Sequence, residues 1–375
     1  MADSPEFLAH FSALPDPRMD RSKRHRLLDI LFIGVCTMIC GGEGFTDMHL
    51  FAVAKEAWLR GFLELPGGIP SHDTFRRVFS LIDPEAFGGC FLAWTAALHE
   101  ATGGEVIALD GKTIRHSFDA ATGQAALHLI SAWATENGLS LGQLKVDGKS
   151  NEITALPALL KLLDISGQIV TMDAMGCQRE LAGQIVAQQG DYVLCLKGNQ
   201  TSLHEEVQYF FREAQATGWH DVPHSYHETA EKDHGRIEIR RCWMVEDPAI
   251  AWLGRGDQWP GLASIAAIEA ERRIGDTVSR ETRYFISSLR GNATQLARAA
   301  RRHWRIENSL HWTLDMTLNE DASRIRTGHA PENLALLRRL ALNLIRIAKP
   351  PKASVRGSIK KAGWDNAFLE MVLVQ

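Results

Sequence analysis

The segments VIALDGK at 106–112 and IVTMDAMG at 169–176 share a pattern that decides the fold. Each begins with four mostly apolar residues and continues with an aspartate, which is followed by a small residue and by a glycine within three positions. Short apolar runs that are bounded by turn-forming residues are typical of buried β-strands. The pattern therefore predicts two strands that end at Asp110 and Asp173.

Strand and helix patterns alternate around these two segments. The turn Glu136-Asn137-Gly138 lies between two strand patterns and indicates an antiparallel meander. After the first segment, the predicted elements are strands over 128–135 and 140–146, a helix over 152–163, a strand over 168–172, a helix over 178–189 and a strand over 191–196. The order β-β-β-α-β-α-β is that of the ribonuclease-H-like fold, in which three antiparallel strands precede parallel strands reached by helical crossovers.

Residues 1–100 predict an all-α domain that precedes this α/β core. Helices are expected over 27–40 and 47–63, and Ser71 is the predicted N-cap of a short helix that carries Arg76 and Arg77. A helix, a turn and a basic helix in this order resemble a helix-turn-helix that binds DNA. In the alternative interpretation, the two arginines simply form a solvated helix face.

Residues 101–375 are predicted to form the ribonuclease-H-like domain, interrupted by a strand-rich insertion at about 200–290. The strands expected in the insertion cover 236–245, 262–270 and 283–287. Beyond it, one helix is predicted from Thr294 towards Leu318 and another over 331–347.

Carboxylates at strand ends suggest a metal-dependent reaction on phosphodiesters, because Mg²⁺ and Mn²⁺ prefer hard oxygen ligands. Strands 1 and 4 of a ribonuclease-H-like sheet are neighbours, so Asp110 and Asp173 are expected to converge. A third acid is expected from a later helix, and Glu307 fits because it follows a strongly basic stretch. Taken alone, either aspartate could be a turn or cap residue, and Glu307 could pair with a neighbouring cation. The other candidates for the third acid are Asp315, Glu320 and Asp321.

A zinc site is the alternative use of the same helix. His303, Glu307 and His311 recur every four residues. Each such step drifts by about 40° around an α-helix, however, and the sequence has no HExxH motif. Magnesium held by carboxylates is therefore the preferred interpretation.

The overall charge does not indicate a nucleic-acid partner, since the net charge is -4 and the isoelectric point is near 6.4. Contacts with DNA are expected from local clusters instead. Residues 333–364 contain eight basic residues and no acid, which favours contact with the phosphate backbone. The other residues expected to contact DNA are Arg76, Arg77, Lys112, Lys197, Asn199, Arg302, His303 and Arg305.

Six cysteines without a CxxC pair are expected to be free thiols in a reducing compartment. The N-terminus shows no secretory pattern, and the apolar run 27–40 is shorter than the roughly 20 residues that a bilayer requires. We therefore expect a cytoplasmic protein with no membrane partner.

Several long motifs give the chain a resemblance to a known family over nearly its whole length. They are LPDPR at 14–18, GIPSHDTFRRVF at 68–79, ALDGKTIRHS at 108–117, KVDGKSNEITALPALL at 145–160, IVTMDAMGCQ at 169–178, GDYVLCLKGNQ at 190–200 and HWRIENSLHWTLD at 303–315. These motifs resemble those of DDE insertion-sequence transposases of the ISAs branch, which includes the H-repeat-associated proteins of Rhs elements.

The resemblance implies a ribonuclease-H-like core, an N-terminal associated domain, dependence on Mg²⁺ (or Mn²⁺), and Asp110, Asp173 and Glu307 as the acidic triad. Broader relatives carry Tyr, Arg and Lys around the glutamate, where this chain has Ala300, His303 and Leu314. The implied activity is cleavage at the ends of a transposon and strand transfer into target DNA. Double-stranded DNA and a second copy of the chain in the DNA complex are the expected partners. The alternatives are a stand-alone metal-dependent nuclease and an inactive DNA-binding relic.

Overall fold

The contacts of the chain divide it into two units, each assembled from segments that are distant in the sequence. The computed structural model describes residues 6–102, 105–120, 123, 125–146, 152–233, 235–246, 249–250, 252–253 and 258–374. Unit 1 comprises residues 1–103, 111–149 and 307–375, and unit 2 comprises residues 104–110 and 150–306. The first segment of unit 1 ends close to the predicted boundary at residue 100, but residues 111–149 and 307–375 also belong to this unit.

Unit 2 is built on a mixed sheet with the strand order β1-β4-β5-β9-β8-β7-β6. Its strands are β1 (Val106–Ile114), β4 (Ile169–Met172), β5 (Asp191–Leu196), β6 (Ser225–Asp233), β7 (Arg236–Glu246), β8 (Ser264–Ile274) and β9 (Thr277–Ser287). β1, β4 and β5 are parallel, and the others are antiparallel. The helices of the unit are α7 (Glu152–Lys161), α8 (Arg179–Ala187), α9 (Thr201–Ala216) and α10 (Ala293–His303). The α/β class and the adjacency of strands 1 and 4 are confirmed.

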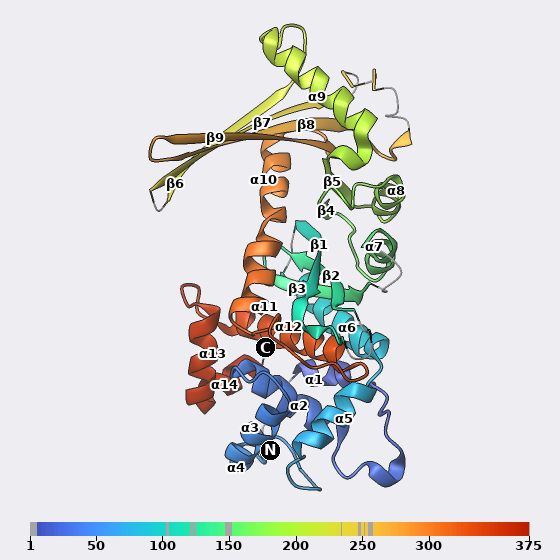
Figure 1. The fold of residues 1–375 in the computed structure, drawn as a ribbon, viewed down its shortest axis with the longest axis vertical. Coiled ribbons are helices and arrows are strands. Elements are labelled where there is room, and N and C mark those ends of the chain that lie inside the picture. Colours follow the sequence, from blue (N-terminus) through green and yellow to red (C-terminus); the bar gives the residue numbers. More distant parts are fainter. Residues whose placement is uncertain are drawn as a thin grey trace. The chain divides into compact units, whose positions relative to one another are not determined.

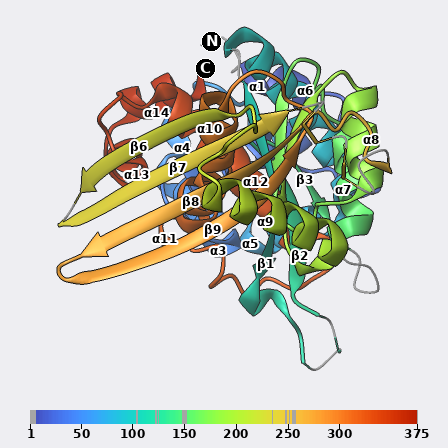
Figure 2. The same ribbon diagram turned by 90° about the horizontal axis from the view of Figure 1, so that it is seen from above.

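The strands of the segment 200–290 continue the sheet of unit 2. β9 pairs with β5 from Val193–Ser287 to Leu196–Tyr284, so the expected strands of the insertion continue the sheet that carries the two aspartates. Figure 2 shows β6 to β9 as long antiparallel strands. The insertion also contains the helix α9 and the strand β6, which the strand-rich interpretation did not include.

β1 is longer than predicted. The expected strand ended at Asp110, whereas β1 continues through Gly111 and Lys112 to Ile114. Its first residues belong to unit 2 and its last to unit 1. In the strand order of unit 1, β1 is followed by β2 (Leu127–Ala134) and β3 (Leu139–Lys145), which form the predicted antiparallel hairpin.

The helices of unit 1 surround one buried helix, α12 (Ala330–Ala348), which packs against α2, α5 and α6 (Figure 1). The other helices of unit 1 are α1 (Glu6–Phe11), α2 (Leu27–Ile39), α3 (Phe45–Ala54), α4 (Glu56–Leu59), α5 (His72–Leu81), α6 (Pro84–Thr102), α11 (Trp312–Met316), α13 (Val355–Trp364) and α14 (Asn366–Leu373). The amide Nδ2 of Asn333 on α12 donates to the carbonyl oxygens of Phe79 at 2.8 Å and Ile82 at 2.9 Å, which fixes the end of α5.

The N-terminal helices differ from a helix-turn-helix. Ser71 caps α5 as predicted, since its Oγ accepts a hydrogen bond from the amide of Thr74 at 3.3 Å. Residues 60–71 separate α4 from α5, however, and this connection is longer than the turn of about 3–4 residues in that motif. Among the described residues, no helix combines the length and the apolar character that crossing a bilayer requires.

Candidate active site

Asp110 and Asp173 occupy neighbouring positions on two parallel strands of unit 2. Leu109 of β1 pairs with Met172 of β4, and each aspartate is the next residue in its chain. Neighbouring strands lie about 4.8 Å apart, so the two carboxylates can approach the same ion. Both residues are half-buried. The structure therefore brings together the pair that the sequence predicted.

The backbone after β4 folds around the Asp173 carboxylate. Its Oδ1 accepts hydrogen bonds from the amides of Met175 at 3.0 Å and Gly176 at 3.3 Å, whereas its Oδ2 accepts none from the residues described. A Cβ atom at Gly176 would lie 2.7 Å from the side chain of Met172, so this tight loop requires glycine there. One carboxylate oxygen is thus used to fix the loop, and the other remains for a ligand.

The turn after β5 braces the same loop. The Nδ2 of Asn199 donates to the carbonyl of Ala174 at 2.5 Å, and the Nε2 of Gln200 donates to the carbonyl of Cys177 at 2.9 Å. Asn199, which was expected to contact DNA, thus also holds the Asp173 loop. The sequence could not indicate this role, because the two segments become neighbours only in the folded sheet.

A small cavity of about 30 Å³ lies beside Asp173 within unit 2. Its lining includes Lys197, Arg283, His303 and Trp304. The Arg283 guanidinium stacks over the Trp304 ring, 4.3 Å from its centroid. Two cations therefore border the carboxylate, which suits a site for a phosphate group. Sequence analysis predicted Lys197 but missed Arg283, whose guanidinium also forms an ion pair of 2.8 Å with Glu281 of the same strand.

His303 is part of the core of unit 2 and is not available to contact DNA. Its side chain is only 9% exposed, and its Nδ1 lies 3.1 Å from the Oγ1 of Thr171 on β4. Burial lowers the pKa of the imidazole to about 4, although the nearby Asp173 carboxylate opposes the shift. The ring is therefore neutral at physiological pH, and its contact with Thr171 explains its position without a zinc ion.

The donor set in unit 2 fits a hard divalent cation. Asp110 and Asp173 supply two carboxylates on adjacent strands, and Oδ2 of Asp173 has no hydrogen-bond donor among the described residues. Magnesium in phosphoryl-transfer sites is usually bound by one or two carboxylates together with substrate phosphates and water. Within the described part of the chain, no group of three or more His, Cys, Asp or Glu side chains is already arranged as a cation site.

Glu307 lies in a π-helical segment, η5 (Ile306–His311), that interrupts the predicted helix over 294–318. Its side chain is exposed. It is the first residue of unit 1 and follows the buried His303 by four residues. Single π-helical turns inside helices are rare and occur frequently at functional sites. The local geometry thus distinguishes Glu307, although it is not what the sequence pattern predicted.

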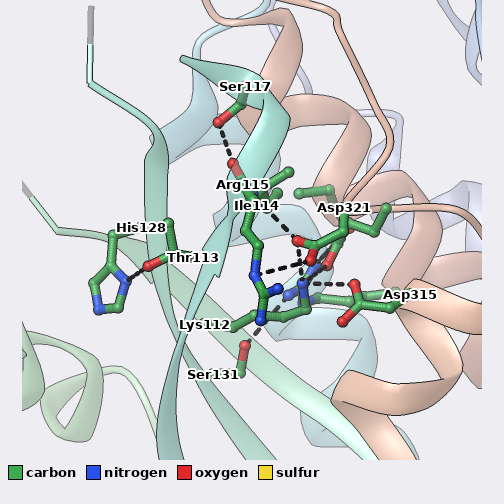
Figure 3. Close-up of polar contacts among 12 residues, drawn as sticks. Lys112, Thr113, Ile114, Arg115, Ser117, His128, Ser131, Asp315 and Asp321 are labelled. Atoms are coloured by element: carbon green, nitrogen blue, oxygen red, sulfur yellow. Dashed lines mark hydrogen bonds and ion pairs between the residues drawn. The ribbon is translucent and has the colours of Figure 1, made fainter.

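The other candidates for the third acid form a charge cluster with Lys112 in unit 1 (Figure 3). The Nζ of Lys112 lies 2.7 Å from Asp315, 3.2 Å from Asp321 and 3.6 Å from Glu320. The lysine side chain is only 7% exposed. Lys112 was expected to reach a phosphate, but it neutralises buried acids instead. These contacts involve all three of the acids that were alternatives to Glu307 as the third acid of the site.

Glu320 and Arg339 extend this cluster into the interior of unit 1. They form an ion pair of 2.8 Å in which both side chains are 0% exposed. Burial opposes ionisation of Glu320, but Arg339 and Lys112 more than compensate and lower its pKa. Arg338 is also buried, and Arg346 donates to the carbonyls of Gly138 and Ser309. These three arginines were expected to contact phosphate and instead stabilise the fold.

The remaining basic residues of the prediction differ in their surroundings. Arg76 forms an ion pair of 3.1 Å with Asp73, whereas Arg77 is exposed and has no carboxylate partner among the described residues. Arg302 is mostly buried and lies 3.7 Å from Glu105. Arg305 is exposed.

Two protein-family models match most of the chain. A family model described as DDE_Tnp_1-associated matches residues 8–95, and one described as Transposase DDE domain matches residues 101–344. The "Putative transposase YncI" of Escherichia coli O157:H7 is 40% identical over 98% of this chain and 94% of its own length. The "H repeat-associated putative transposase YhhI" of E. coli K12 is 39% identical over 98% of this chain and 97% of its own.

Among solved structures, a piggyBac transposase synaptic complex with hairpin DNA aligns with 97% of this chain and 75% of its own, with a TM-score of 0.41 and 11% identity. The two family matches together with the full-length relatives decide the assignment. The chain belongs to the DDE transposase family, and it carries both the DDE domain and the N-terminal domain associated with it.

Proposed function

We propose that this chain cuts DNA at the ends of an insertion sequence and joins them to target DNA, with Asp110, Asp173 and Glu307 holding two divalent cations, Mg²⁺ or Mn²⁺. The observation that carries the proposal is the register of β1 and β4, which sets the two aspartates side by side in unit 2. When bound, the ions would activate the attacking oxygen and stabilise the leaving oxygen of an in-line displacement. Cleavage and joining are both phosphoryl transfers, so one site can serve both reactions.

Glu307 is the third acid that the surroundings favour. Asp315, Glu320 and Asp321 are engaged by Lys112, whereas Glu307 is exposed. Glu307 also follows, by four residues, the buried His303, whose ring contacts Thr171.

Cations beside Asp173 would orient the phosphodiester. Lys197 is exposed at the end of β5, and Arg283 borders the same cavity with its guanidinium held against Trp304. A phosphate that these two cations neutralise would lie next to the Asp173 carboxylate. Arg77 and Arg305 are exposed cations that could contact the DNA backbone further along.

Substitution of each acid tests the proposal on DNA that carries the two ends of the element surrounding the gene. Asp110→Asn, Asp173→Asn and Glu307→Gln should each abolish cleavage and joining in Mg²⁺ while end binding is retained. Asp321→Asn is the matched control, because its carboxylate is a cluster partner of Lys112, and it should still cut the DNA. An active Glu307→Gln variant, or a folded Asp321→Asn variant without activity, would contradict the assignment. Cleavage by the wild type without joining would favour the nuclease alternative instead.

A further inference from the structure

A second polar cavity lies in unit 1, far along the sequence from the acids. Its volume is about 270 Å³. It is formed by Arg24 and His25, by the loop that contains Gly67, and by Ser71, Thr74 and Arg77 at the start of α5. None of its described lining residues is acidic. Pockets for drug-sized ligands usually measure about 300–1,000 Å³, so this cavity suits a small polar group.

The two arginines of this cavity differ from the cations around them. Lys23 pairs with Asp20 at 2.9 Å, Arg26 with Glu64 at 2.6 Å and Arg76 with Asp73 at 3.1 Å. Arg24 and Arg77, in contrast, have no carboxylate partner within the described residues. Both guanidinium groups border the same cavity, so an anion bound in it could interact with both of them.

Local packing fixes the position of Arg24. A Cβ atom at Gly67 would lie 2.4 Å from the carbonyl oxygen of Arg24, so only glycine allows the loop to approach this closely. The ring of His25 is held through its Nδ1, which lies 3.2 Å from the carbonyl oxygen of Gly68. The hydroxyls of Ser71 and Thr74 lie 3.1 Å apart and can also face an anion. The backbone at Arg24 and the ring of His25 thus have defined positions beside these hydroxyls.

We propose that this cavity binds one backbone phosphate of double-stranded DNA, held between the guanidinium groups of Arg24 and Arg77. Guanidinium groups bind phosphate oxygens with paired hydrogen bonds, which explains why two arginines, and no lysine, line the cavity. The inference rests on the proposed function, because that function requires DNA to contact the chain. It adds Arg24 to the interface and gives Arg77 a specific partner.

The salt dependence of DNA binding tests the proposal with the full-length chain and a fluorescent 30-base-pair duplex. Each phosphate that a protein neutralises contributes about 0.9 to the slope of log K against log salt concentration. The double variant Arg24→Ala/Arg77→Ala should weaken binding by about tenfold or more, since hydrogen bonds to charged groups are strong. It should also lower the slope by about 0.9, the amount for a single phosphate.

Two further double variants test whether a loss of DNA binding comes from the arginine contacts themselves or from the loss of positive charge. Thermal unfolding tests whether the variants remain folded. Lys23→Ala/Arg26→Ala removes the same number of charges, both next to Arg24, but these two cations are already paired, so the slope should not change. Arg24→Lys/Arg77→Lys keeps the charge and should restore the slope while affinity stays reduced. All variants should unfold at the wild-type temperature, because the substituted side chains are exposed.

The results that would overturn the proposal are distinct from a failure of the proposed function. Wild-type affinity and slope in Arg24→Ala/Arg77→Ala would exclude DNA phosphate from the cavity, as would equal losses in the Lys23→Ala/Arg26→Ala control. Stabilisation of the wild type alone by inorganic phosphate, without any effect on DNA binding, would assign the cavity to a free anion. A wild-type chain that binds duplex but does not cut it would contradict only the proposed function. Failure to bind duplex at all would overturn both.

Discussion

Lys112 carries a nearly buried charge that three neighbouring acids stabilise. Asp315, Glu320 and Asp321 all lie within 3.6 Å of its Nζ. Removing one partner of a buried ion pair costs about 3–5 kcal/mol, because the remaining charge stays buried without compensation. Lys112→Met should therefore lower the free energy of unfolding in a urea titration, by less than this amount because Arg339 still compensates the buried Glu320. Arg115→Ala is the control, because that side chain is 79% exposed and should have little effect. Equal stability of wild type and Lys112→Met would show that the cluster is solvated.

His303 gives a second measurable consequence at the residue scale. Its folded-state pKa is about 4, below the ordinary value of 6.5, because the ring is buried. Its contribution to stability is thus complete above pH 6.5 and is lost as the pH falls towards 4, where the unfolded chain binds a proton that the folded chain does not. Titration of the His303 Hε1 resonance by NMR should show a midpoint near 4. In Asp173→Asn the midpoint should fall further, since the carboxylate favours the protonated ring. A midpoint near 6.5 would mean that the ring is solvent-accessible.

Sequence patterns predicted the two aspartates but not the interactions of the residues next to them. Asp110 and Asp173 were predictable because strand period and turn residues are local signals. Lys112 follows Asp110 closely and was assigned to the same site, yet its partners are residues 315–321. Such pairing depends on tertiary contacts between distant segments, and no local pattern records it.

At the scale of elements, Glu271 links three long strands of unit 2 through a shared carboxylate. It accepts hydrogen bonds from Arg273 on β8, Arg241 on β7 and Arg280 on β9. The Arg273 hydrogen bond, together with those of Arg241 and Arg280, lowers the pKa of Glu271 to about 2 from the ordinary 4.5. The stability that this carboxylate contributes is therefore complete above pH 4.5 and is lost as the pH falls towards 2.

Acid unfolding of wild type and Glu271→Gln tests this linkage. The wild type should be more stable at neutral pH, and the difference in unfolding free energy should shrink between pH 4.5 and 2. Glu205→Gln, an exposed substitution on α9, should leave a pH profile parallel to that of the wild type. If the difference in unfolding free energy does not change with pH, the stability provided by the three arginine contacts does not depend on the charge of Glu271.

The elements that sequence analysis missed had weak or misinterpreted signals. α9 buries Leu203, Val207, Phe211 and Ala214, which follow a helical period, but the neighbouring strand patterns dominated the interpretation. β6 has almost no apolar face, and its residues are mostly exposed, so alternation could not reveal it. It is stabilised by pairing with β7 along its whole length, which only the folded sheet provides.

At the scale of the whole molecule, the boundary near residue 100 in the sequence differs from the boundary between the two units that the contacts define. The two family models meet near residue 100, as the sequence-based boundary did. The helices before that point nevertheless share their core with residues from the other end of the chain. α12 contributes a nearly continuous buried surface to α2, α5 and α6, and its residues are more than 200 positions away. A boundary drawn from sequence alone cannot include such a contribution.

This shared core predicts that the N-terminal helices do not fold alone. A fragment of residues 1–102 would expose the apolar side chains of α2 and α5 that α12 covers, and the polar carbonyls that Asn333 satisfies would lose their partner. We expect helical signal without a cooperative thermal transition, measured by circular dichroism. Addition of a fragment of residues 307–375 should restore part of the transition. In the intact chain, Asn333→Ala should cost about 1–3 kcal/mol, because buried acceptors lose their donor. A fragment that melts cooperatively at the temperature of the full chain would show that the N-terminal helices are an independent domain.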